Sequence, residues 1–480
     1  MFTAFPSTKR TRCCQHRHSE DLGDCYTIGA LFSCPKFHLA LPMSHAVVIG
    51  GSIAGLLAAR AMLNHFDQVT LLERDCFHDG PSPRPGIPQA QHVHALLMRG
   101  HQILESFFPG LTEDLSEQGA LLLDWTADWR FLTLWDWMPR HVSNLKSLIC
   151  SRLLLEWYLR DRLLQMPGFN VQEAATVTGL TATDDATRIT GVVLAINGEP
   201  GTLPADWIVD ASGRNSKLSD WLVKLGFQRP PEITVNSFIG YASRWYQRPS
   251  EGAIEGVIVA AKPGVTRRGG VLYPVEGDRC VITLSGIEKD YPSSDEEEFL
   301  SFAQSLRDPS IANAIRGWEP ISPIQCYRRT ENHWRHFEKL STLPEGIVAV
   351  GDAVCAFNPI YGQGMTAAAL GASLLDSSMQ HPQRQGLGLR FQKQLAQELM
   401  SPWLMATSED FRWEMTTGDR PGWLSQQLQR YFDRVAQAAN HDPSVHRAFI
   451  EVAHLAKPPT HLLRPRTAWK AITLPSTATP

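Results

Sequence analysis

The feature that most constrains the fold is a short apolar run followed by two glycines and a helix pattern. Residues 45–49 read HAVVI, which is typical of a buried parallel strand, and Gly50-Gly51 supplies a tight turn. Residues 52–64 have helix composition, and a second apolar run at 69–72 ends in Glu73. This order of strand, turn, helix and strand predicts a βαβ unit, and the N–H groups at the start of its helix can bind a pyrophosphate.

The turn departs from the usual dinucleotide fingerprint G-x-G-x-x-G, because its three key positions are Gly50, Ser52 and Gly55. Serine is small enough for a phosphate to approach if its φ is negative, and Gly55 permits close packing of the helix on the strand. Glu73 ends the second strand, where an acid binds ribose hydroxyls and would repel a 2′-phosphate. The pattern therefore predicts FAD or NAD at this site and disfavours NADP.

A later segment favours FAD over NAD. Residues 347–376 contain another buried strand that ends in Gly351-Asp352, followed by a loop and a helix of small residues. An Asp at a strand end can accept a hydrogen bond from a ribitol hydroxyl, and the helix start at Gly364-Met365 can direct N–H groups at a flavin pyrimidine oxygen. The segment closely resembles the G-D…P-x-x-G-Q-G stretch of the class A flavoprotein monooxygenases, the para-hydroxybenzoate hydroxylase family. The matching residues are Pro359, Gly362, Gln363 and Gly364.

The resemblance covers residues 45–470, and it is closest to the bacterial FAD epoxidases of polyether biosynthesis, which act on polyene olefins. Its further motifs are G-I-P-Q…H-x-H at 86–94, D-A-S-G-R at 210–214 and A-F-N-P-I-Y-G at 356–362. It implies that Arg84 and Arg152 face FAD phosphate or ribose, and that Val177 lies on a strand that flanks the adenine. The cofactor-binding residues that it implies are Gly50, Ser52, Gly55, Glu73, Arg74, Arg84, Arg152, Val177, Asp352, Pro359, Gly362, Gly364 and Met365.

The source of electrons stays open. The family carries a D-G motif after a middle strand, and there it also helps reduced pyridine nucleotide bind. Here residues 210–213 read D-A-S-G. The resemblance therefore implies either direct use of a reduced pyridine nucleotide or supply of electrons by a separate flavin reductase.

The predicted fold class is α/β, with a Rossmann-like FAD-binding domain of the para-hydroxybenzoate hydroxylase type, an inserted mixed β-sheet substrate domain and a C-terminal helical region. Residues 1–42 are interpreted as a non-structural extension. The expected domains are 43–120, 149–225 and 330–385 for FAD, 121–148 and 226–329 for substrate, and 386–480 for the helical region. The expected strands of the substrate sheet are 237–241, 253–260, 270–274 and 280–285, with a hairpin turn at 276–278.

Composition excludes several other classes. The chain has 480 residues, of which 43% are apolar and 20% charged, so it can bury a sizeable core. A net charge of −4 does not suggest a nucleic-acid partner, and no segment reaches the ~18 apolar residues of a transmembrane helix. The nine cysteines show no C-x-x-C pair, which predicts free thiols in the cytoplasm and no metal site. Basic residues near the C-terminus leave open a weak peripheral membrane contact.

The resemblance implies a monooxygenase reaction in which a reduced flavin adds O₂ at C4a and the hydroperoxide transfers one oxygen to a lipophilic small molecule. Epoxidation and hydroxylation both fit. The cofactor carries the hard step, so no protein nucleophile is required. Pocket candidates are His92, His94 and Tyr273, since the two histidines are spaced to share a face in extended chain and Tyr273 lies in an expected strand.

Three alternatives remain. One is an FAD-dependent reductase or dehydrogenase of a prenyl-type substrate, similar to the geranylgeranyl reductases. Another is a flavin-dependent halogenase, because residues 135–139 read WDWMP and resemble the halogenase motif W-x-W-x-I-P. That motif follows the middle segment in halogenases, whereas here it precedes Arg152. The third alternative is a non-catalytic flavoprotein.

Overall fold

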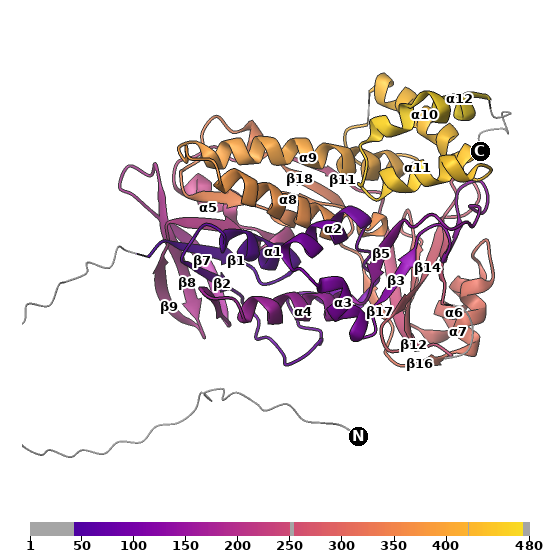
Figure 1. The fold of residues 1–480 in the computed structure, drawn as a ribbon, viewed down its shortest axis with the longest axis horizontal. Coiled ribbons are helices and arrows are strands. Elements are labelled where there is room, and N and C mark those ends of the chain that lie inside the picture. Colours follow the sequence, from indigo (N-terminus) through magenta and orange to yellow (C-terminus); the bar gives the residue numbers. More distant parts are fainter. Residues whose placement is uncertain (1–42, 250–253, 421, 474–480) are drawn as a thin grey trace, which may run out of the picture. The chain divides into compact units, whose positions relative to one another are not determined.

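The computed structural model describes residues 43–249, 254–420 and 422–473 (Figure 1). The interpretation of residues 1–42 as an extension lies outside these residues. Within them, the expected α/β fold with an added sheet and a helical C-terminal region is confirmed. In Figure 1 the parallel sheet and its helices lie on the left, and the second sheet and the last helices lie on the right.

A parallel sheet has the strand order β19-β10-β1-β2-β6. Since all its strands are parallel, their carboxyl ends meet at one edge, where ligands bind in folds of this type. That edge carries Gly50, Glu73 and Asp352, which follow three of its strands directly or by a few residues. The bounds are β1 (His45–Ile49), β2 (Gln68–Leu72), β6 (Phe169–Gln172), β10 (Trp207–Asp210) and β19 (Ile347–Ala349).

Helices made mainly of small and apolar residues cover this sheet. Helix α1 packs on α8 and α4, and α8 also packs on α2 and α9. A meander of β7, β8 and β9 adjoins the sheet and carries Val177. The bounds are α1 (Ile53–Met62), α2 (Met98–Phe107), α3 (Leu111–Glu117), α4 (Arg152–Leu164), α5 (Leu218–Lys224), α8 (Gly364–Met379), β7 (Ala175–Ala182), β8 (Ile189–Ile196) and β9 (Glu199–Pro204).

The second sheet is mixed and has the order β16-β12-β15-β14-β13-β4, with β17 on the edge of β12. Its parallel pair joins β4 to β13, so the segment 121–148 contributes a strand to the sheet formed by residues after 226. Helices α6 and α7 pack on this sheet through Phe299, Phe302 and Ile311. The bounds are β4 (Trp129–Leu132), β12 (Gly240–Gln247), β13 (Gly256–Val259), β14 (Arg268–Val275), β15 (Arg279–Gly286), β16 (Glu319–Pro320), β17 (Gln325–Tyr327), α6 (Glu296–Gln304) and α7 (Ser310–Gly317).

Local side-chain chemistry corrects one strand and explains one turn. The strand expected at 237–241 begins only at Gly240, because the Asn236 side chain accepts a hydrogen bond from the Phe238 N–H and Phe238 adopts a left-handed φ of 52°. The expected hairpin turn between β14 and β15 is present. Gly277 and Asp278 have φ values of 71° and 52°, as a tight hairpin requires.

The remaining strands form one sheet of two strands and one of three, and the last helices complete the fold. Strand β11 pairs with β18, and β18 pairs with β20, so this small sheet combines segments expected in different domains. Among the described residues, no helix is long and apolar enough to cross a membrane. The bounds are β3 (Leu121–Asp124), β5 (Lys146–Ile149), β11 (Glu232–Val235), β18 (Asn332–Arg335), β20 (Cys355–Ala356), α9 (Leu387–Asp410), α10 (Trp423–Ala439), α11 (Pro443–Ala453) and α12 (Pro465–Thr473).

Candidate functional site

A cavity of about 600 Å³ lies at the carboxyl edge of the parallel sheet and reaches strands β12 and β17 of the second sheet. Its lining includes every residue that the sequence analysis assigned to the cofactor, except Gly55. These residues are Gly50, Ser52, Glu73, Arg74, Arg84, Arg152, Val177, Asp352, Pro359, Gly362, Gly364 and Met365.

Gly55 acts from outside the cavity by bringing helix α1 close to β1. A Cβ atom at Gly55 would lie 1.8 Å from the Gly50 carbonyl oxygen, so only glycine permits this approach. Gly50 itself has a φ of 102°, which favours glycine. Ser52 has a φ of −100°, so a serine stands at the middle position without backbone strain.

Arg84 is buried at the centre of an ionic cluster below the turn. Its guanidinium lies 2.9 Å from Glu73 Oε2, 2.9 Å from Glu156 Oε1 and 3.2 Å from Asp75 Oδ2, and it donates to the Gly51 carbonyl oxygen. Burial lowers the pKa of Arg84, but the Glu156 and Glu73 carboxylates outweigh that effect and raise it. Arg84 is thus fully committed to protein partners, and it holds Glu73 in place.

Glu73 keeps one oxygen available for a ligand. Its Oε2 accepts from the Gly51 N–H at 2.7 Å and from Arg84, whereas among the described residues its Oε1 accepts only from the Asp75 N–H, at 3.0 Å. A carboxylate oxygen can accept two hydrogen bonds, so Oε1 can also accept from a ribose hydroxyl.

Arg152 faces the cavity beside the start of α1. It donates to Ser52 Oγ at 2.7 Å and to His94 Nε2 at 3.0 Å, and it lies 3.7 Å from Glu156. Its Nε is buried and has no partner among the described residues. An unused donor of a buried guanidinium, next to the N-terminus of a helix, fits a phosphate group.

Glu156 was missed by the sequence analysis, although it links both arginines to Ser52. Its Oε2 accepts from Ser52 Oγ at 2.9 Å. The available signal was its position four residues after Arg152 and four before Arg160, which places it between two arginines on one helix face.

The two histidine candidates take different places. His94 lines the cavity, whereas His92 lies behind it. Since Arg152 only donates and the His92 carbonyl oxygen only accepts, His94 carries its proton on Nδ1 and accepts at Nε2. Burial and the Arg152 charge hold the pKa of His94 well below its ordinary value. Burial lowers the pKa of His92 to about 4, so both rings are neutral at neutral pH.

The second sheet contributes a pair of tyrosines that the sequence analysis missed. Tyr241 on β12 and Tyr327 on β17 are register partners, their rings lie 5.4 Å apart, and both line the cavity. The His92 ring packs edge-on against Tyr241 at 4.7 Å, and His92 bonds Ser243 Oγ at 2.8 Å. No local sequence pattern indicates Tyr327, because its strand pairs with one that is far away in the sequence.

Tyr273 does not reach the cavity. It is buried in β14 against Trp129, with 5.5 Å between the ring centroids, and its hydroxyl has no partner among the described residues. Burial raises its pKa well above the ordinary value. The structure therefore separates Tyr273 from the two histidines with which it was grouped.

The start of α8 and the strand end before it leave room and polar groups for a ligand. Gln363 Oε1 and Thr366 Oγ1 are also buried without a partner in the described part of the chain, but neither residue lines the cavity. A Cβ atom at Gly364 would meet no atom within 4 Å, so the start of α8 faces open space. Asp352 stays partly exposed, with Arg214 Nε 3.8 Å away. These features fit a large planar ring with hydrogen-bonding edges.

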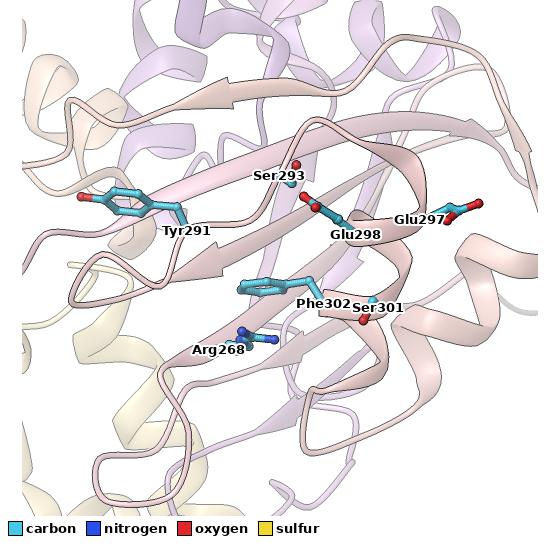
Figure 2. A pocket seen from close by; sticks show the side chains of 7 residues that line it. All are labelled: Arg268, Tyr291, Ser293, Glu297, Glu298, Ser301 and Phe302. Carbon is cyan, nitrogen blue, oxygen red and sulfur yellow. The ribbon is translucent and has the colours of Figure 1, made fainter.

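A separate pocket of about 410 Å³ lies beside α6 (Figure 2). Its Arg268 bonds Asp290 at 2.7 Å and lies over the Phe302 ring at 4.4 Å, so that cation is already neutralised. This pocket shares no lining residue with the cavity at the parallel sheet. Within the described residues, no cluster of side chains could hold a metal ion.

The sequence model of the FAD binding domain family matches residues 43–385. The chain is also 32% identical over 430 residues to Protein Rv3254 of Mycobacterium tuberculosis, covering 85% of this chain and 89% of that protein. The family match includes the residues that line the cavity in the flavin-type segments.

Solved structures share the fold at low sequence identity. A flavoprotein/dehydrogenase from Cytophaga hutchinsonii has a TM-score of 0.60 at 17% identity, covering 85% of this chain and 92% of that one. The flavin-dependent brominase Bmp2 gives 0.59 at 15%, covering 86% and 98%. The FAD-dependent monooxygenase PqsL of Pseudomonas aeruginosa gives 0.55 at 15%, covering 86% and 100%.

Proposed function

Because the chain belongs to the FAD binding domain family, we propose that it is an FAD-dependent monooxygenase that inserts one oxygen atom from O₂ into a lipophilic small molecule by epoxidation or hydroxylation. The observation that carries the proposal is that a single cavity joins the expected cofactor residues to the aromatic wall of the second sheet. A cofactor and a substrate can therefore meet in one cavity.

The proposed cofactor contacts follow from the geometry of the lining. Arg152 and the start of α1 hold the pyrophosphate, and Glu73 Oε1 accepts from the adenosine ribose. Arg74 and Val177 flank the adenine, and Asp352 accepts from the ribitol chain. The N–H groups at Gly364 and Met365 face the pyrimidine edge of the flavin. When bound, FAD supplies the activation of O₂.

The aromatic contacts proposed for the substrate are neutral. Tyr241, Tyr327 and the neutral His94 offer hydrogen bonds and apolar ring surface, whereas Arg214, Arg329 and Asp352 of the same lining are charged and interact electrostatically with Tyr327. Burial raises the pKa of Tyr241 above its ordinary value, so its hydroxyl remains protonated. Such a wall fits a lipophilic molecule with few polar groups, which the resemblance to polyether epoxidases suggests is an olefin.

Electrons reach the flavin from a reduced pyridine nucleotide, either directly or through a separate flavin reductase. The residues after β10 are compatible with both routes. Asp210 is buried and accepts hydrogen bonds from the Ser212 and Ser216 hydroxyls, which fits supply by a separate reductase. The cationic Arg214 and Lys217 line the cavity, which fits direct binding of a pyridine nucleotide. We place the reaction in the cytoplasm, and the free thiols of the described cysteines support that location.

The test is rapid mixing of photoreduced, FAD-loaded protein with oxygenated buffer while the flavin spectrum is recorded. We expect a transient species before the oxidised spectrum returns, and incorporation of isotopically labelled oxygen into a polyene substrate. Direct return to the oxidised spectrum without labelled product would contradict a monooxygenase and favour a reductase or a carrier.

Halide dependence of the product would instead identify a halogenase. The WDWMP segment does not support that alternative, because Trp135 and Trp137 are absent from the cavity lining and the Trp137 ring centroid lies 4.6 Å from the Arg130 guanidinium.

A further inference from the structure

A buried carboxylate lies where the long helix α9 ends. Asp410 has no solvent exposure, and it accepts hydrogen bonds from Asn332 Nδ2 at 2.6 Å, Asn358 Nδ2 at 3.0 Å and the Tyr361 hydroxyl at 2.7 Å. The Ser237 hydroxyl donates to it as well. Four neutral donors from three separate segments therefore converge on one carboxylate.

No cationic side chain in the described part of the chain forms an ion pair with Asp410. The nearest candidate by sequence, Arg412, is held by the carboxylates of Glu409 and Asp433. These two acids and the Tyr361 phenol are the titratable groups around this site. Burial raises the pKa of Asp410 to about 6, while its four donors act in the opposite direction. The charge is thus held by hydrogen bonds alone, which is costly unless every donor is in place.

Two of these donors belong to the loop that lines the cavity. Asn358 and Tyr361 enclose Pro359, and the chain continues directly into Gly362 and Gly364. Asn358 is fixed further because its N–H donates to Asn332 Oδ1 at 2.8 Å. Any displacement of Asp410 therefore moves the start of α8, where the unused N–H groups face the cavity.

We propose that Asp410 is a positioning residue for the flavin loop, residues 358–364. By holding Asn358 and Tyr361, it fixes the direction of the N–H groups at the start of α8, and so sets FAD affinity and the reduction potential of the bound flavin. This inference rests on the proposed function, because it requires FAD in the cavity.

The chemistry of the carboxylate makes the role specific. An ionised carboxylate accepts from all four donors, whereas an asparagine or a protonated carboxyl presents a donor of its own and must lose at least one of them. The loop should therefore loosen when Asp410 is protonated or replaced by asparagine, although the volume of the side chain hardly changes.

The experiment compares FAD dissociation constants from flavin fluorescence for the wild type, Asp410→Asn and Tyr361→Phe between about pH 5.5 and about pH 8. We expect wild-type affinity to weaken below about pH 6. Asp410→Asn should bind about tenfold more weakly at neutral pH, with a flat profile and a shifted flavin reduction potential. Tyr361→Phe should bind about threefold more weakly.

The matched control is Glu409→Gln, which removes the neighbouring carboxylate and should keep both the affinity and the pH profile of the wild type. An Asp410→Asn protein with wild-type affinity and profile overturns the inference while leaving the proposed function intact. If Asp410→Asn does not fold, wild-type affinity in Tyr361→Phe overturns it. A wild-type protein that binds no FAD overturns the proposed function and this inference together.

Discussion

Two clusters beside the cavity bury charge in opposite ways. The Arg84 guanidinium contacts three carboxylates, so each of these buried charges has a partner of opposite sign within 3.2 Å. Around Asp410, one carboxylate is held only by amides and hydroxyls. An ion-paired cluster keeps its geometry over a wide pH range, whereas burial raises the pKa of the Asp410 carboxyl to about 6 although its hydrogen-bond donors act to lower it. We infer that the first cluster is a rigid support and the second responds to pH.

The largest expected effect comes from breaking the ion-paired cluster. Arg84→Met leaves Glu73 and Glu156 buried without their cation, which should lower the free energy of unfolding by about 3–5 kcal/mol. Urea unfolding measures it. Arg84→Lys is the matched control, because it keeps the charge but loses the forked geometry, and it should lose less. A loss below about 1 kcal/mol in Arg84→Met would show that the cluster is not a support.

The second prediction concerns the pH dependence of stability. Since the pKa of Asp410 is raised from 3.8 to about 6, the folded state binds this proton more tightly, and ionisation lowers stability as pH rises through this interval. Buried His92 and His446 act in the opposite sense. Burial lowers their pKa from 6.5 to about 4, so their contribution is lost as pH falls.

We therefore expect the wild type to lose stability below about pH 6.5, and Asp410→Asn to lose about 2–3 kcal/mol more over the same range, since one pKa unit is worth about 1.4 kcal/mol. Urea unfolding at several pH values tests this expectation. Parallel curves for the two proteins would contradict the raised pKa of Asp410.

The third prediction separates the two arginines. Arg152→Gln should weaken FAD binding about tenfold, because it removes a charged donor that faces the cavity, yet it should lower the free energy of unfolding by less than Arg84→Met does, because Glu156 keeps Arg84 as its cation. Arg162→Gln provides the control on the same helix, since Arg162 pairs with Asp114 away from the cavity. Equal FAD affinity in the Arg152 and Arg162 variants would remove Arg152 from the proposed phosphate site.

The smallest effect distinguishes two buried tyrosines. Tyr361→Phe removes a donor to Asp410 and should cost about 1 kcal/mol, whereas Tyr273→Phe removes an unpaired hydroxyl and should be neutral or slightly stabilising. Thermal unfolding of both variants checks the difference. Destabilisation by Tyr273→Phe would indicate a partner, such as a buried water, for that hydroxyl.

Most residues of the proposed cofactor site could be predicted, because the sequence patterns that indicate them are local. The Gly50-Ser52-Gly55 turn, Glu73 at a strand end and Gly362-Gly364 at a helix start each follow from backbone needs within a few residues. Parallel strand order then brings these separate segments to one edge. The cavity lining accordingly contains nearly all of the residues expected there.

The side chains that the second sheet contributes to the cavity could not be predicted, because their positions depend on pairing between strands that are far apart in sequence. Tyr327 reaches the cavity because β17 pairs with β12, in which its partner Tyr241 lies near the opposite end of the substrate segment 226–329, and no pattern near Tyr327 indicates that contact. Tyr273 was a pocket candidate, but its place in β14 directs it into the core. Register decides which face a strand residue occupies, and only the assembled sheet fixes the register.

The sequence alone determined the βαβ unit, the FAD-type segments and the division into a parallel sheet, a second sheet and a helical end, because turn chemistry and hydrophobic periodicity are encoded locally. Only the tertiary structure decided which charges are compensated. Glu156 and Asp410 are ordinary acids in sequence, yet one completes an ion-paired cluster and the other is buried among neutral donors. The energy of a buried charge depends on what surrounds it in space, and those neighbours come from segments far apart along the chain.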